Sequence, residues 1–320
     1  MIRLATLLLV LLWAGLAAAA PAPSAVLVVN SGAASLSVID LATHTERASI
    51  PVLREPHHWA LSPDGRDLLV GDSAANEVLF LDPVSFAIRR RLPIADPYQL
   101  GFSPDGKLFV VAGIARAQLD VYDAQSFALV HRFALKSMPS HIDFSPDSAM
   151  VFVSLQGTGK AAGIDLKTMT VAWTADVGPA PAGVMWLGGH VLVANMGSDN
   201  VAVLDPHNGT VLRRVVTGKG AHQLFLSLDR RTLYVNNRVD STIAALDANS
   251  LAPIRTYKVP GGPDDLVFAP DGRIWVTLRF VAKVGVLDTK TGVLETFPVG
   301  RSPHGIYIQG ATNSGGARGL

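Results

Sequence analysis

Short runs of apolar residues, rich in Val, Leu, Ile and Phe, alternate with brief polar turns along almost the whole chain. Within the runs, apolar and polar positions show little strict alternation, which is typical of strands that pack on both faces. No stretch after the first twenty residues keeps an apolar period of about 3.6 residues, so we expect almost no helix there. The pattern predicts an all-β protein.

One strand pattern, an apolar run that ends in Asp, recurs seven times at intervals of 42, 41, 42, 40, 42 and 41 residues. The same order of four strands surrounds each Asp, and a turn of the Ser-Pro-Asp-Gly type, as at 62–65 and 103–106, joins the first two. The shorter Leu-Gly-Gly-His turn at 187–190 accounts for the 40-residue interval. The recurring residues, which we interpret as turn caps and not as acid catalysts, are Asp40, Asp82, Asp123, Asp165, Asp205, Asp247 and Asp288.

Four strands per repeat of about 40 residues predict a seven-bladed β-propeller of four-stranded antiparallel blades over 21–310. The run Ala-Val-Leu-Val-Val-Asn at 25–30 matches a second strand of the repeat, and the missing first strand is His-Gly-Ile-Tyr-Ile at 304–308. The two ends of the chain are therefore expected to pair in one shared blade, which leaves no open edge. A linear solenoid is the alternative, but it would need capping repeats.

The first twenty residues have the pattern of a secretory signal peptide. Arg3 precedes an apolar run that ends in Ala18, Ala19 and Ala20, immediately before Pro21. A membrane anchor is the alternative, but no charged stop follows the run. We therefore predict a protein that is periplasmic or secreted and has no membrane span in its mature form. The Gly-rich segment 311–320 is predicted to be a flexible tail.

Charge and composition remove several function classes. The chain has 27 Lys and Arg against 26 Asp and Glu, so no global charge favours nucleic acid, which we consider an unlikely partner. The absence of Cys excludes disulfides, thiolate metal sites and a cysteine nucleophile. The basic residues at 89–91, 213–214 and 230–231 fall on predicted outer strands or turns and are interpreted as solvated blade edges.

Histidine is concentrated at one point of the repeat, where the chain passes from the outer strand of one blade to the inner strand of the next. In a propeller these junctions converge on the mouth of the central channel, where ligands usually bind. Five of the nine histidines lie at the two positions that start each inner strand. The paired positions are His304-Gly305, His57-His58, Tyr98-Gln99, Ser140-His141, Ala182-Gly183, His222-Gln223 and Asp264-Asp265.

This pattern predicts a binding site, for which no catalytic residue can be named. Neutral imidazoles with a carboxylate suit a divalent transition metal, and His57, His58 and His304, from adjacent blades, are the candidate ligands. His222 and Asp264 form a second adjacent pair, while His141 is expected to stand apart. A purely structural or hydration role for these residues is the alternative. The candidate ligand-binding residues are His57, His58, Tyr98, Gln99, His141, His222, Asp264 and His304.

The repeats at 191–218 and 233–259 and the segment Val-Gly-Arg-Ser-Pro-His-Gly-Ile-Tyr-Ile (299–308) resemble the YVTN family of β-propeller repeats, to which YncE-like exported bacterial propellers belong. The resemblance implies the fold but not an activity. The leading hypothesis is a non-enzymatic propeller that binds a small ligand, a metal ion or a periplasmic protein. Metal-assisted hydrolysis or elimination on a lactone or ester is one alternative, because 263–297 resembles streptogramin-lyase repeats. Single-stranded DNA binding, implied by the YncE-like relatives, is another.

Overall fold

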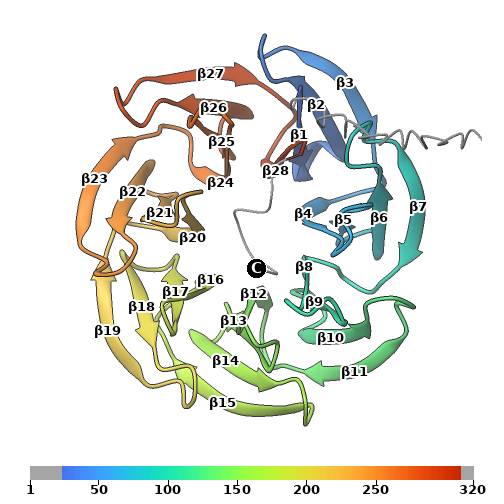
Figure 1. Cartoon of the computed structure of the whole chain (residues 1–320), viewed down its shortest axis with the longest axis vertical. Coiled ribbons are helices and arrows are strands. Elements are labelled where there is room, and N and C mark those ends of the chain that lie inside the picture. The colour runs from blue at the N-terminus through green and yellow to red at the C-terminus, as the bar shows by residue number, and fades with distance from the viewer. Residues whose placement is uncertain (1–23, 311–320) are drawn as a thin grey trace, which may run out of the picture.

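The computed structural model describes residues 24–310, which form a ring of seven four-stranded antiparallel sheets (Figure 1). We number the sheets as blades 1 to 7 and give their strands from the axis outwards. Blade 1 contains β28 (Pro303–Ile308), β1 (Ala25–Asn30), β2 (Ser35–Asp40) and β3 (Glu46–Pro51), with the 3-10 helix η1 (Ser31–Ala33) between β1 and β2. Blade 2 contains β4 (Pro56–Leu61), β5 (Leu68–Asp72), β6 (Glu77–Leu81) and β7 (Ile88–Pro93); blade 3 contains β8 (Gln99–Phe102), β9 (Leu108–Gly113), β10 (Gln118–Asp123) and β11 (Leu129–Ala134); and blade 4 contains β12 (Pro139–Phe144), β13 (Met150–Leu155), β14 (Lys160–Asp165) and β15 (Thr170–Asp176). Blade 5 contains β16 (Pro181–Leu187), β17 (His190–Asn195), β18 (Asn200–Leu204) and β19 (Val211–Val216); blade 6 contains β20 (Ala221–Leu226), β21 (Thr232–Asn237), β22 (Thr242–Asp247) and β23 (Pro253–Lys258); and blade 7 contains β24 (Pro263–Phe268), β25 (Ile274–Leu278), β26 (Lys283–Leu287) and β27 (Leu294–Pro298).

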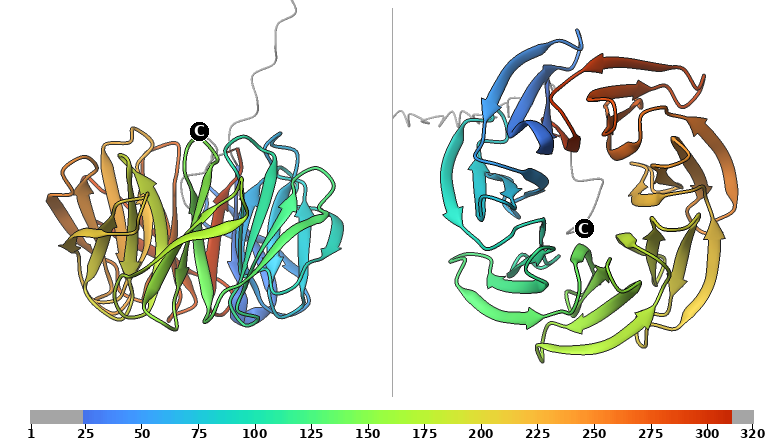
Figure 2. Two further views of the ribbon diagram at one scale, coloured as in Figure 1. Left: turned by 90° about the horizontal axis from the view of Figure 1, so that it is seen from below. Right: turned by 180° about the vertical axis from the view of Figure 1, so that it is seen from behind.

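The predicted closure of the ring is confirmed. Strand β28 pairs antiparallel with β1, with Val26 opposite Ile308 and Leu27 opposite Tyr307. Two sequence-distant segments therefore share blade 1, as Figures 1 and 2 show. The pairing covers the inner edge of β1, and β28 takes the innermost place that the first strand holds in each of the other blades.

The apolar core is divided among the interfaces between neighbouring blades. Each of the seven hydrophobic clusters joins two adjacent blades, as where Trp173 of blade 4 packs with Val193 of blade 5. Blade faces therefore need apolar residues on both sides, which explains the weak alternation along the strands. Only the outer strands, such as β7 and β19, are largely exposed.

The chain direction separates two faces of the ring. We call the face where the inner strands begin the top face; it also carries the turns between second and third strands. The bottom face carries the Ser-Pro-Asp-Gly type turns and the turns that follow the recurring Asp residues. The short turn at 187–190 is a two-residue hairpin in which Gly188 and Gly189 have φ of +58° and +81°, as a type I′ turn requires.

The recurring Asp residues cap these bottom turns, as predicted. Asp82 accepts the backbone N–H groups of Val84 and Ser85, at 2.8 and 2.7 Å, and the six other Asp residues accept equivalent bonds. These hydrogen bonds stabilise the turns, so the carboxylates act as turn caps.

A β-bulge near the start of the inner strands sets the direction of the candidate site residues. The pairing register shifts between Pro56 and Trp59 in blade 2 and between Pro139 and Ile142 in blade 4, and comparable shifts occur in blades 1, 5, 6 and 7. A bulge inserts an extra residue and re-aims side chains that strict alternation would send to opposite faces. Neighbouring residues such as His57 and His58 therefore both reach the ring axis.

Residues 24–310 contain no helix of the length and apolar character needed to cross a bilayer. The predicted signal peptide, 1–20, and the predicted tail, 311–320, lie outside the described residues.

Candidate functional site

The five predicted histidines meet at the ring axis. The imidazole of His58 has its centroid 4.4 Å from that of His304 and 5.1 Å from that of His141, and His222 lies 5.3 Å from His141 and 6.3 Å from His304. His57 joins the group 5.1 Å from His304. We call these five residues the axial histidine cluster.

The expectation that His141 stands apart was wrong. Inner strands from non-adjacent blades converge so closely at the axis that imidazoles from blades 1, 2, 4 and 6 contact one another across it. The length of the side chains and their redirection by the bulges bring these rings together although their blades are not adjacent. All five side chains are buried, so the cluster lies below the rim of the ring.

Asp264 is the electrostatic centre of the site. Its carboxylate is fully buried and lies against Arg238, and Arg279 Nη1 is 3.3 Å from its Oδ2. The Nδ1 atoms of His222 and His304 are 3.3 and 3.2 Å from the same carboxylate. The predicted proximity of His222 and Asp264 is thus observed, with two arginines and a second histidine in addition.

The axial histidines are held in the neutral form. Burial lowers the pKa of His141 to about 3 and places those of His58, His222 and His304 well below the usual range, and positive neighbours act in the same direction. Burial also lowers the pKa of His57, although Glu55, 3.3 Å from its Nε2, opposes the shift. A neutral imidazole offers one donor and one acceptor, so the cluster can bind polar groups of either kind.

Several ring nitrogens of the axial histidine cluster have no hydrogen-bond partner within the protein, although they are buried. They are His57 Nδ1, His58 Nε2, His141 Nε2 and both nitrogens of His304, whose Nδ1 is near Asp264 but poorly aligned with it. Buried polar atoms are nearly always paired in folded proteins. Their unused donors and acceptors make the axial histidine cluster a candidate binding site.

Tyr98 and Gln99, the candidates from blade 3, differ in position. The Tyr98 ring is 4.5 Å from His57 and is partly exposed, so it lies at the edge of the cluster. Gln99 instead accepts the backbone N–H of Ile142, which ties blade 3 to blade 4. Asp265 accepts the backbone N–H of Ile306 in the same way, which ties blade 7 to blade 1.

Sequence reasoning missed Arg238 and Arg279. Each is the first residue after the second strand of its blade, on the top face, where the other five blades have uncharged residues. Their side chains are only 15% and 23% exposed, and burial lowers the pKa of Arg238 to about 9. Their signal in the sequence is their position in the repeat, because the residue after the second strand is Arg only in blades 6 and 7. The equivalent residues are Ser31, Ser73, Ile114, Gln156 and Met196.

The residues from 24 to 310 contain no group of three or more His, Asp or Glu side chains in an arrangement that could hold a metal ion. The set His57, His58 and His304 therefore stays a prediction from the sequence. Two guanidinium groups at the same place are also poor neighbours for a cation.

The basic runs on the outer strands bond to the protein itself. Arg89 pairs with Asp82, Arg91 with Glu77, and the Arg90 guanidinium lies 3.9 Å above the Phe80 ring. These contacts agree with the interpretation of the runs as blade edges.

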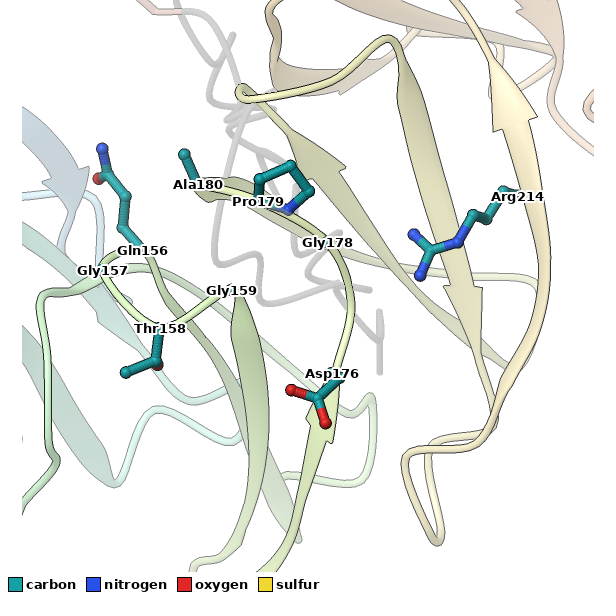
Figure 3. A pocket seen from close by; sticks show the side chains of 9 residues that line it. All are labelled: Gln156, Gly157, Thr158, Gly159, Asp176, Gly178, Pro179, Ala180 and Arg214. Carbon is teal, nitrogen blue, oxygen red and sulfur yellow. The ribbon is translucent and has the colours of Figure 1, made fainter.

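A separate cavity of about 560 Å³ lies on the top face where blades 4 and 5 meet. It is lined by the turn from Gln156 to Gly159, by Gly178 to Ala180, and by the side chains of Asp176 and Arg214 (Figure 3). Arg214 donates to Val177 O, and Asp176 pairs with Lys160 at 2.9 Å. None of the predicted site residues lines this cavity.

The closed ring of seven blades defines the protein as a β-propeller, and the axial histidine cluster is a candidate ligand site at the centre of the ring. A family model described as "YNCE-like beta-propeller" matches residues 4–313, so the chain belongs to the YncE-like β-propeller family. A search of the curated proteins found no match.

Several solved structures share the fold at low sequence identity. A functionally unknown protein from Desulfotomaculum acetoxidans is 14% identical with a TM-score of 0.74, covering 89% of this chain and 98% of that one. The Pseudomonas aeruginosa periplasmic gluconolactonase PpgL is 19% identical with a TM-score of 0.73 and the same coverage. The dihydro-heme d1 dehydrogenase NirN, solved in complex with DHE, is 17% identical with a TM-score of 0.67, covering 92% of this chain and 78% of NirN.

Proposed function

We propose that this protein is an exported, non-enzymatic propeller that binds a small anionic ligand at the axial histidine cluster. The observation that carries the proposal is the convergence of Arg238 and Arg279 on the single carboxylate of Asp264. Among the buried groups, two guanidinium groups against one carboxylate leave one positive charge in excess, and it attracts an anion. Glu55, the other carboxylate that interacts with Arg279, is about half exposed, so solvent weakens its opposing effect.

The arginines keep donors available for that anion. Arg238 Nε is buried without a partner, and Arg279 contacts Asp264 through Nη1 alone. Planar guanidinium groups of this kind bind carboxylate or phosphate through paired hydrogen bonds. The unpaired nitrogens of the axial histidines then bond to hydroxyl or carbonyl groups of the same ligand.

Export of the protein to the periplasm is part of this proposal. It is supported by the signal-peptide pattern of residues 1–20 and by the likeness of the fold to a periplasmic protein, PpgL. Single-stranded DNA is not part of it, because the overall charge is balanced and the basic runs on the outer strands bond to the protein.

Replacing one arginine tests the proposal. Acetate binding is measured by NMR titration for the wild type, for Arg279→Gln and for Arg116→Gln, a control on a top-face turn of blade 3 that bonds to Asn76. We expect Arg279→Gln to weaken binding at least tenfold, because a charge-assisted bond is lost, and the control to leave it unchanged. Equal affinity in all three proteins, or no binding in the wild type, would contradict the proposal.

A second candidate, lactone hydrolysis, is favoured by one observation. Glu55 lies 3.3 Å from His57 Nε2, and the Nδ1 of that ring is unpaired, an arrangement in which a carboxylate orients a general base. In such a reaction His57 takes a proton from water, the water oxygen bonds to the lactone carbonyl carbon, and the ring C–O bond breaks. The leaving alcohol oxygen takes that proton back from His57, and the product carboxylic acid loses its proton to water, so that the carboxylate faces Arg279.

Turnover of δ-gluconolactone, corrected for its spontaneous hydrolysis, separates the two candidates. Hydrolysis requires a wild-type rate above background that falls at least a hundredfold in His57→Gln and in Glu55→Gln. If the wild type does not accelerate the reaction while acetate still binds, the binding function stands alone. The control His190→Gln changes an exposed histidine on the bottom face.

A further inference from the structure

In blades 6 and 7, a large exposed apolar residue directly follows the arginine in the turn between the second and third strands. Val239 and Phe280, the residues directly after Arg238 and Arg279, are 67% and 64% exposed. The residue at the same place in each of the other five blades is Gly or Ala, namely Gly32, Ala74, Ala115, Gly157 and Gly197. Exposed apolar residues are ordinary in proteins, and Leu53 and Met138 are exposed on other top-face connections. At this position of the turn, however, a large apolar residue occurs only in the two blades that supply the guanidinium groups.

The backbone fixes these side chains close to the site. Arg279 N donates to Gly262 O at 3.0 Å and Phe280 N to Gly261 O at 2.9 Å, so the turn is bonded to the connection that leads into β24. A Cβ atom at Gly262 would overlap the Phe280 ring, which shows that the ring lies directly on this glycine. Gly262 is two residues before Asp264.

Blade 6 repeats this arrangement. Arg238 N donates to Gly220 O at 2.9 Å, and Val239 packs against Gly220, which is two residues before His222. The same combination of arginine, apolar residue and glycine thus occurs in adjacent blades. One face of each apolar side chain rests on a glycine and the other is open, as expected of a surface that a ligand covers.

From this placement we infer that the ligand is a monocarboxylate with an alkyl or aryl body, its carboxylate at Arg238 and Arg279 and its body on Val239 and Phe280. The inference deepens the proposed function and rests on it. A single negative charge fits better than two, because Asp264 neutralises one arginine and Glu55 adds a further carboxylate beside His57. A sugar acid would leave the two apolar side chains uncovered.

A chain-length series tests the inference. The dissociation constants of acetate, butyrate, hexanoate and octanoate, all kept below micelle formation, are measured by calorimetry or NMR, with gluconate as the polar comparison. Each methylene that leaves water tightens binding about three- to fourfold. Because the surface covers only part of the chain, we expect octanoate to bind the wild type at least thirtyfold more tightly than acetate, and gluconate to bind no better than acetate.

In the variant Val239→Ser/Phe280→Ser, the dissociation constants of the four fatty acids should lie within threefold of one another. Its affinity for acetate should equal that of the wild type. Leu228→Ser is the matched control, because Leu228 is 59% exposed on a bottom-face turn; it should keep the wild-type slope. Acetate binding without chain-length dependence, or an unchanged slope in the double variant, would overturn this inference and leave the proposed function intact. Failure of every acid to bind, or binding that ignores Arg279→Gln, would overturn the proposed function itself.

Discussion

The two ends of the inner strands both carry repeated polar residues, but they use them differently. At the bottom end, Ser62 donates to Asp64 at 2.7 Å and accepts from the N–H of Asp67 at 3.0 Å, so its partners lie within five residues. At the top end, the partners of Asp264 come from turns or strands of blades 6, 7 and 1, and several axial histidine nitrogens have none. Polar groups that bond to near neighbours in the chain stabilise a turn, whereas buried polar groups left without partners make the top end the candidate site.

Removing the central carboxylate should have the largest effect on stability. Asp264→Ala leaves two largely buried guanidinium groups without their partner, and we expect the free energy of unfolding to fall by about 3–5 kcal/mol. The bottom-face control Asp205→Ala removes a turn cap from an accessible carboxylate and should cost about 1 kcal/mol. Urea unfolding of both variants measures these free energies. Equal losses in the two variants would contradict the proposed difference between the top and bottom ends.

The second largest expected effect is a loss of stability in acid, caused by the buried groups at the top end. The pKa of His141 is about 3 in the folded protein and about 6.5 in the unfolded chain. The contribution of the neutral His141 ring to the free energy of unfolding is therefore present above pH 6.5 and is lost as the pH falls. At pH 5 the loss is about 2 kcal/mol. The buried Asp265, whose pKa is raised to about 7, acts with the opposite sign: its contribution is present below pH 4 and is lost as the pH rises through 7.

Thermal unfolding of the wild type and of His141→Gln at pH 7 and pH 5 measures the histidine contribution. The loss of stability between the two pH values should be smaller in the variant by that amount. The control His190→Gln alters an exposed residue on the bottom face. Its loss of stability between pH 7 and pH 5 should equal that of the wild type. A wild-type pH dependence that the His141 change leaves intact would show that this ring is not held neutral.

Anion affinity should fall in mild alkali. Because burial lowers the pKa of Arg238 to about 9, its charge is full at pH 7 and mostly lost at pH 10. We expect acetate to bind about tenfold more weakly at pH 10, since one unit above the pKa leaves about a tenth of the group charged. NMR titration at the two pH values checks this; constant affinity would mean that Arg238 does not hold the anion.

Chelation should have the smallest effect. If the arginines carry the anion, treating natively purified protein with EDTA leaves acetate affinity unchanged within twofold. Elemental analysis of the same sample, made without a histidine tag, measures any bound ion. A stoichiometric metal whose removal abolishes acetate binding would instead support the set His57, His58 and His304 as metal ligands.

The repeat accounts for how much could be predicted. The spacing of the recurring Asp residues and the split first blade were enough for the blade number and the closure, because both depend on local strand patterns. The candidate site was found by position: all five histidines chosen from the repeat alignment are in the axial cluster. The error over His141 and the omission of Arg238 and Arg279 both concern distances between blades, which a repeat alignment does not contain.

By itself the sequence determined the architecture and the residues that begin each inner strand, because turns, caps and strand periodicity act over a few neighbouring residues. Only the tertiary structure decided which of those residues touch. The bulges turn consecutive side chains toward the axis, and the closed ring brings imidazoles from four blades together. It also sets the turns of blades 6 and 7 over Asp264, so that residues distant in the chain share one buried charge.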